Sequence, residues 1–246
     1  MELGEYEIMY NVEDRHWWYL GMATITRGVL DRYIGRDKRL AILDAGCGTG
    51  ATMGYLRDYG VPTGVDLSPE ALRLCSSRRI PRICQASITD LPFPDETFDL
   101  ITSFDVLSEA GPVKDEQGLD EFLRVLEAGG HLLLRLPAYS WLRGQHDERV
   151  HTRRRYTRRE IKRMLPAHGF EIVKISYVNT ALFPLAVGKR LSERILKPKR
   201  EGSDLTLATG LLNSVFKALL SAEAPFVRTT SLPFGLTLLV LARKPD

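Results

Sequence analysis

The sequence predicts an α/β protein built on a doubly wound sheet. From residue 40 onward, short apolar segments alternate with helical segments, which is the pattern of parallel strands covered on both faces. The first apolar segment runs directly into a turn with glycine at alternate positions, where a ligand can approach the backbone closely. The chain has 246 residues, of which 44% are hydrophobic and 26% charged, and this suits a globular protein. We therefore expect a single domain over residues 1–246.

Seven short apolar segments predict seven strands. Their bounds are 40–43, 61–65, 82–85, 98–103, 130–136, 170–177 and 236–243. Between them, the apolar spacing predicts helices from near Thr49, over 68–77, around 118–126 and over 157–168. Ser68 suits the N-cap of the second of these helices, and Pro69 suits its first helical position. The alternation of strand and helix continues to the sixth strand.

Two segments outside this alternation are predicted to be helical additions. Residues 1–36 are rich in aromatic residues, so we expect an N-terminal cap before a core at 37–177. The segment 178–235 carries amphipathic stretches at 182–196 and 205–220, and residues 236–246 form the last strand. We expect this insertion to be a lid over the open end of the sheet. A core element, a dimer face and a peripheral membrane contact are the alternatives.

The charge and the cysteines narrow the function only slightly. The formal net charge is +3, which by itself does not indicate nucleic-acid or membrane binding. Arginines crowd residues 149–163, where they form either a solvated helix face or a site for an anionic ligand. Cys47, Cys75 and Cys84 lack metal-type spacing and give no closed disulfide framework. With no secretory signal and no apolar run of about 20 residues, we expect a cytoplasmic protein without a metal site.

The glycine-rich turn is the strongest signal of a ligand. It reads Asp44-Ala45-Gly46-Cys47-Gly48-Thr49-Gly50. The spacing differs from the Gly-x-Gly-x-x-Gly of dinucleotide folds and from the Gly-Lys-Ser/Thr of phosphate loops. The Asp44 carboxylate would repel a pyrophosphate, but it suits the ammonium and sulfonium groups of S-adenosylmethionine. The turn therefore favours a cationic ligand.

A second carboxylate follows the second predicted strand. Asp66 lies 20 residues after Gly46, where an acidic side chain can accept both ribose hydroxyls of an adenosine. Folds that bind NAD place an acid similarly, so Asp66 indicates a nucleoside without selecting the cofactor.

A third motif leads to a family. Residues 86–101 read Ala-Ser-Ile-Thr-Asp-Leu-Pro-Phe-Pro-Asp-Glu-Thr-Phe-Asp-Leu-Ile. With the glycine turn, Asp66 and this segment in order, the chain resembles class I S-adenosylmethionine-dependent methyltransferases of the type 11-like group. The resemblance covers residues 40–177, and Leu-Glu-Ala-Gly-Gly at 126–130 matches the usual Leu-x-x-Gly-Gly of that family.

This resemblance implies a fold, a cofactor and its binding residues. The fold would be a Rossmann-like seven-stranded sheet with an antiparallel last strand. S-adenosyl-L-methionine, with S-adenosyl-L-homocysteine as product, would lie at the carboxyl ends of the first strands. The turn would hold the methionine portion, with Phe104 near its end, and Asp66 would hold the ribose while Ser87 and Ile88 flank the adenine. The full predicted set is Asp44, Gly46, Cys47, Gly48, Gly50, Asp66, Leu67, Ser87, Ile88 and Phe104.

Three positions depart from the family pattern. Ser87 stands where relatives often have an aspartate, and Ser108 with Glu109 replaces a common Glu-His. The N-terminal segment 16–22 resembles that of relatives that carry arginines near Leu20 and Met22. If such an arginine normally holds the cofactor carboxylate, this chain either uses another partner or binds more weakly.

The acceptor side is less defined. His146, His151 and Tyr156 follow the fifth strand, in an arrangement that resembles a bacterial methyltransferase subgroup associated loosely with glycan and lipid pathways. They are candidates for a general base or for acceptor binding, and the alternative is that they brace the loop. Asp105 is either a methyl-site residue or a helix cap.

These observations predict methyl transfer by direct displacement. The expected acceptor is a small molecule, a sugar or a lipid-linked molecule, and nucleic acid is disfavoured because no nucleic-acid-binding module is visible. The alternatives are a scaffold or regulatory protein that binds S-adenosylmethionine without catalysis, and a nicotinamide-dependent oxidoreductase. The glycine spacing and Asp44 disfavour the second. The sequence does not predict the oligomeric state.

Overall fold

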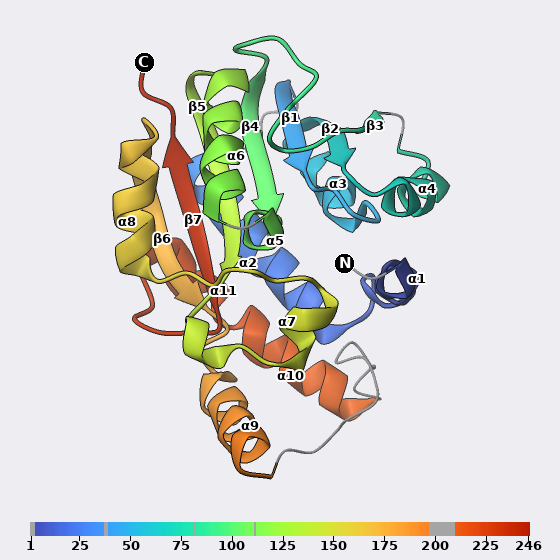
Figure 1. Cartoon of the computed structure of the whole chain (residues 1–246), viewed down its shortest axis with the longest axis vertical. Helices are drawn as coiled ribbons and strands as arrows, with labels where there is room; N and C mark the ends of the chain where they lie inside the picture. The colour runs from blue at the N-terminus through green and yellow to red at the C-terminus, as the bar shows by residue number, and fades with distance from the viewer. Residues whose placement is uncertain (1–2, 37–38, 81, 111, 197–209) are drawn as a thin grey trace.

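The computed structural model describes residues 3–36, 39–80, 82–110, 112–196 and 210–246, and it contains one seven-stranded sheet (Figure 1). The strands have the order β3-β2-β1-β4-β5-β7-β6. Strands β1 to β5 pair in parallel, and β7 is antiparallel to both of its neighbours. The strand bounds are β1 Leu40–Ala45, β2 Gly60–Asp66, β3 Ile83–Gln85, β4 Phe98–Phe104, β5 Leu126–Pro137, β6 Glu171–Val178 and β7 Thr237–Arg243. The predicted Rossmann-like sheet with an antiparallel last strand is confirmed.

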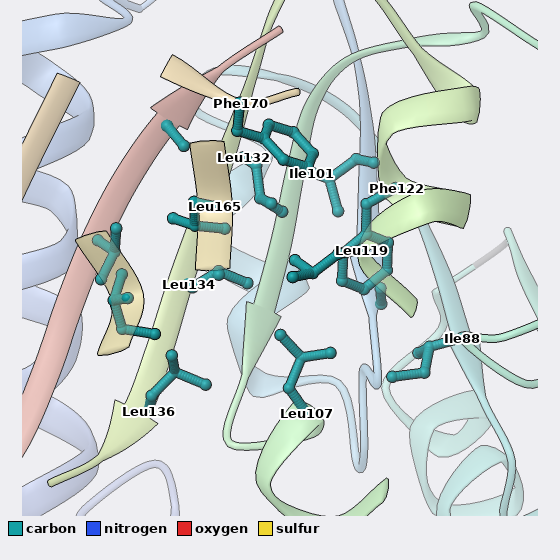
Figure 2. Packing of buried hydrophobic residues seen from close by; sticks show 14 of the residues in the cluster. Ile88, Ile101, Leu107, Leu119, Phe122, Leu132, Leu134, Leu136, Leu165 and Phe170 are labelled. Carbon is teal, nitrogen blue, oxygen red and sulfur yellow. The ribbon is translucent and has the colours of Figure 1, made fainter. Parts of the chain in front are cut away.

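Helices cover both faces of the sheet. In Figure 1, α6 (Pro112–Val125) and α8 (Arg158–Ala167) lie in front of it and α2 (Trp17–Tyr33) lies behind. Alternation along β5 supplies both cores, because successive side chains of a strand point to opposite faces. Leu132 and Leu134 join the cluster under α6 and α8 that Figure 2 shows, whereas Leu133 joins the cluster under α2.

Local capping explains where two predicted helices begin. Helix α4 (Pro69–Ser77) begins after Ser68, whose hydroxyl accepts the Ala71 N–H at 3.3 Å. Helix α8 begins at a capping box in which Thr157 and Glu160 satisfy each other's backbone N–H groups. Helix α3 (Ala51–Leu56) follows the glycine turn. These starts agree with the predicted ones.

Two boundaries differ from the prediction. Helix α6 begins at Pro112 and not near Gly118. Gly118 lies inside the helix, where an added Cβ would be 3.1 Å from Ile88 Cδ1, so this glycine reflects close packing. Strand β5 begins at Leu126, before the predicted residue 130.

The additions to the sheet gather near the carboxyl ends of β1 and β4. The N-terminal segment contains α1 (Leu3–Val12), which was not predicted separately and packs on α4. The insertion contains α9 (Phe183–Leu196), α10 (Leu211–Ser221) and α11 (Ala224–Thr229). Residues 197–209, which include the start of the predicted helical stretch 205–220, lie outside the described residues. The short segments α5 (Leu107–Ala110), η1 (Ser140–Leu142) and α7 (Gln145–Arg149) complete the fold, and Figure 1 shows α7, α9 and α10 below these strand ends.

Candidate functional site

A cavity of about 1590 Å³ opens at the carboxyl ends of β1, β2 and β4. Its walls include the glycine turn, helix α1, the start of α2, the chain around α7, and helices α9 and α10. Pockets for a single small ligand usually measure about 300–1,000 Å³. The cavity therefore has room for two ligands side by side.

Asp44 provides a buried carboxylate in this cavity. Its Oδ1 accepts the Thr102 hydroxyl at 2.6 Å, while its Oδ2 has no hydrogen-bond partner among the described residues. The side chain is only 2% exposed, and burial raises the pKa of Asp44 to about 7. A carboxylate with one unpaired oxygen in a low dielectric is suited to a cationic ligand group.

The glycine turn is held by β2, and its position 46 cannot accept a larger residue. The N–H groups of Gly46 and Cys47 donate to the Val65 carbonyl at 2.8 and 2.9 Å. Gly46 has a φ of +86°, and an added Cβ would lie 2.0 Å from Val106 Cγ2. Both the backbone conformation and the packing therefore require glycine. Cys47, Gly48 and Gly50 line the same cavity.

Asp66 lies where β2 ends, beside the turn. Its two oxygens accept the N–H groups of Gly48 and Ser68, each at 2.9 Å. These bonds fix the carboxylate and leave further lone pairs toward the cavity, which Asp66 also lines. Burial raises the pKa of Asp66. The arrangement can accept a pair of hydroxyl groups.

Apolar and small polar side chains continue the wall beyond Asp66. Leu67 is exposed, and Ile88 is buried except where it meets the cavity. The Ser87 hydroxyl lies 2.8 Å from the Thr89 hydroxyl. Together these residues offer flat apolar contact with a polar edge, which suits an aromatic ring system.

Arg135 on β5 is a site residue that the sequence prediction missed. Its guanidinium carbon lies 4.7 Å from the ring centroids of both Trp18 and Phe104. Its Nε donates to Asp105 Oδ2 at 2.7 Å. Within the described part of the chain, this is the one hydrogen bond of its side chain. The available signal was a single charge inside the apolar run 132–136.

Some of the residues predicted for the acceptor side line the cavity. His151 is exposed and lines the cavity, and Asp105 lines it as well. The loop is braced by Asp147, which is 2% exposed and paired with Arg155 at 2.8 Å. His146 lies in α7, but its side chain is outside the described residues.

Tyr156 does not line the cavity. It is fully buried in the core, and its hydroxyl donates to Asp115 Oδ2 at 2.6 Å. Burial, together with Asp115, raises the pKa of the hydroxyl. This geometry gives Tyr156 the position of a brace, and we do not propose it as the general base.

Three further acidic or phenolic groups border the site without having been predicted. Glu13 hydrogen-bonds Thr49 of the turn and pairs with Arg78 at 2.9 Å, which ties α1 over the cavity. Burial raises the pKa of Glu109 to about 7 and that of Tyr6 to about 12. Glu109 was noted only as a departure from the family pattern. Among the described residues, no cluster of His, Cys, Asp and Glu could hold a metal ion.

Comparisons with known proteins agree with this geometry. A family model described as a methyltransferase domain matches residues 43–134, from β1 into β5. A demethylmenaquinone methyltransferase of Tropheryma whipplei is 34% identical over 128 residues, which are 50% of this chain and 48% of that protein. An uncharacterised protein of Methanocaldococcus jannaschii is 30% identical over 152 residues, 59% of this chain and 70% of that protein. The chain belongs to the class I S-adenosylmethionine-dependent methyltransferases.

The chain spans about half the length of the first curated relatives that it matches. The fold match extends further. A chain of the complex between the Haloferax volcanii Trm112 methyltransferase activator and a methyltransferase superposes with a TM-score of 0.63 at 19% identity, covering 99% of this chain and 95% of that one. Together with the strand order, this places the whole described chain in the methyltransferase fold. None of the described helices is long and apolar enough to cross a bilayer.

Proposed function

We propose that the protein transfers the methyl group of S-adenosylmethionine to a small-molecule, sugar or lipid-linked acceptor by direct displacement. The observation that carries this proposal is the unpaired, buried Asp44 oxygen in a cavity that also contains Asp66. The two carboxylates fit the two ends of this cofactor: Asp44 suits the α-ammonium group, and Asp66 suits the ribose hydroxyls. Leu67 and Ile88 would contact the adenine faces, with Ser87 at its edge.

Arg135 is our candidate for the carboxylate of the cofactor. Leu20 lines the cavity without a charge and Met22 is fully buried in the core, so neither replaces the arginines of similar chains. The Arg135 charge acts on Asp44, whose pKa it lowers against the larger effect of burial. An amino acid group with its ammonium on Asp44 would thus place its carboxylate toward this cation. The rings of Trp18 and Phe104 contact the Arg135 guanidinium and would fix its position for binding this carboxylate.

Methyl transfer requires the protein mainly to align the acceptor with the methyl group. S-adenosylmethionine supplies a methyl group on a positively charged sulfur, which is a good leaving group. The cavity walls would align the acceptor and exclude water. A base is required only when the acceptor arrives protonated, as a hydroxyl does. His151 and Asp105, which line the cavity, and His146 remain the candidates for that role.

The apolar side chains that line the cavity support an acceptor with an apolar part. The apolar lining includes Leu182, which precedes α9, Leu185 and Ala186 of α9, and Phe216 of α10. Lys217 and Arg153 add positive charge to the same lining. One relative is named for methylation of demethylmenaquinone, which is compatible with an organic acceptor of this kind.

Calorimetric titration with S-adenosylhomocysteine tests the cofactor site. We expect binding near the micromolar range, and Asp66→Ala should weaken it by about 10- to 100-fold through loss of charge-assisted hydrogen bonds. NADH should not bind. Absence of S-adenosylhomocysteine binding would contradict the proposal, and binding without turnover on any acceptor would favour the scaffold alternative.

A second titration tests Arg135 separately. The ligand 5′-methylthioadenosine shares the adenosine of the cofactor but lacks the amino acid group. Arg135→Ala should weaken S-adenosylhomocysteine by about 10- to 100-fold and leave 5′-methylthioadenosine unchanged. Equal losses for both ligands would show that Arg135 acts on the fold of the site and not on the carboxylate.

A further inference from the structure

The outer face of α10 is apolar and exposed. Leu211, Leu212, Val215 and Leu219 are exposed by 83%, 59%, 44% and 43%, respectively. Their spacing of three and four residues places them on one side of the helix. Such a concentration of exposed aliphatic side chains on one helix is unusual for a protein surface and indicates a contact site. We define these four residues as the α10 face.

The orientation of this face is fixed by the packing of the opposite side. Asn213 accepts the Trp17 N–H at 2.8 Å and donates to the Arg15 carbonyl at 2.9 Å. Phe216 contacts the Trp17 ring at a centroid distance of 5.5 Å. Gly21 of α2 allows the closest approach, because a Cβ there would lie 2.7 Å from Leu220. Helix α10 therefore cannot rotate to bury the α10 face against its own chain without losing these contacts.

The α10 face lies beside the mouth of the acceptor side of the cavity. Phe216 and Lys217 of the same helix line the cavity, as does Leu185 of α9. Leu185 is also strongly exposed, so apolar surface continues from the cavity to the outside of the molecule.

Charge on this side of the molecule is positive. The charged residues of α10 and α11 are Lys217 and Arg228, and both are exposed. The acidic residue between the helices, Glu223, is buried and accepts three backbone N–H groups from residues 179–181. Exposed leucines beside basic residues complement an anionic lipid surface.

A second copy of the chain fits this face less well. A two-fold dimer would bring the basic residues of each α10 region toward those of its copy, which opposes association. A stable dimer also uses about 20–30 residues on each side, many more than the α10 face supplies. Insertion of a few leucines at the headgroup boundary requires no such area.

We propose that the α10 face docks the protein on an anionic membrane surface, so that the neighbouring cavity mouth receives an amphiphilic acceptor from the bilayer. This inference rests on the proposed function and narrows its acceptor class. The cofactor end of the cavity, at Asp44 and Asp66, would remain open to the aqueous phase for exchange of cofactor and product.

Vesicle co-sedimentation of the full chain tests the docking. The vesicles are phosphatidylcholine alone and phosphatidylcholine mixed with phosphatidylglycerol. We expect binding to the mixed vesicles only, with a loss of affinity as salt rises. The variant Leu211→Gln/Leu219→Gln should bind at least about tenfold more weakly. Its matched control is Val61→Gln/Val173→Gln, which removes two exposed aliphatic side chains elsewhere and should bind like the unmodified protein.

Two further measurements distinguish membrane docking from misfolding and from dimer formation. S-adenosylhomocysteine titration of the Leu211→Gln/Leu219→Gln variant should match the unmodified protein, which shows that the fold is intact. Sedimentation velocity should show a monomer; a dimer that this variant abolishes would assign the face to a second copy and overturn the proposal. Failure to bind anionic vesicles, or equal loss in the control variant, would overturn it as well. Absence of S-adenosylhomocysteine binding by the unmodified protein would instead refute the proposed function.

Discussion

The buried Asp44 carboxyl should make cofactor binding depend on pH. Without ligand, burial raises its pKa to about 7. An ammonium group on Asp44 Oδ2 would favour the charged carboxylate and lower that pKa in the complex. Below pH 7, binding must therefore release a proton from Asp44, and the free energy of that release is subtracted from the binding energy.

The size of the effect follows from the pKa. For each pH unit below a pKa of about 7, the fraction of ionised Asp44 in the free protein falls about tenfold. The dissociation constant of S-adenosylhomocysteine should accordingly rise about tenfold from pH 8 to pH 6 and about 100-fold from pH 8 to pH 5, as long as the complex keeps Asp44 ionised. Protonation of Asp66, whose pKa is also raised by burial, adds to the loss at the acidic end.

Calorimetry in two buffers of different ionisation enthalpy measures both the affinity and the proton release. The matched variant Asp44→Asn cannot ionise at this position, so its weaker binding should lose the step between pH 8 and pH 6. A dissociation constant that is flat over this range in the unmodified protein would refute the reasoning. The same slope in Asp44→Asn would assign the titration to another group, such as Glu109.

Three other predictions concern stability. The pKa of Asp44 is raised from 3.8 to about 7 in the folded protein, so its contribution to stability is fully present below about pH 4 and is lost as the pH rises to 7. The variant Asp44→Asn should therefore stabilise the ligand-free protein at pH 8 by up to about 4 kcal/mol in urea unfolding, and no gain in stability would contradict this. Gly46→Ala should cost about 2–5 kcal/mol, because of its positive φ and the clash with Val106, whereas the control Gly188→Ala, with open space around it, should cost nothing. Tyr156→Phe should lower stability by about 1–3 kcal/mol while leaving S-adenosylhomocysteine affinity unchanged; a large loss of affinity would place Tyr156 in the site after all.

Much of the fold could be predicted because its signals are local. Strand and helix periodicity can be recognised within a few turns of chain, and the cap at Ser68 acts within three residues. The glycine turn and Asp66 belong to the same class of signal. The chemistry of a tight turn and of a strand end depends on neighbours in sequence, so the sequence alone determined these elements and the candidate cofactor residues.

Only the tertiary structure decided which distant residues meet. Arg135, Trp18 and Phe104 come from three separate parts of the chain, and in the fold Arg135 lies between the two rings. The position of Arg135 near Asp44 depends on the order of the strands. The sequence offers both Tyr156 and His151 as candidates, and only the packing shows that Tyr156 is buried while His151 is exposed. Such contacts arise from long-range burial of apolar surface, which leaves no periodic mark in the sequence.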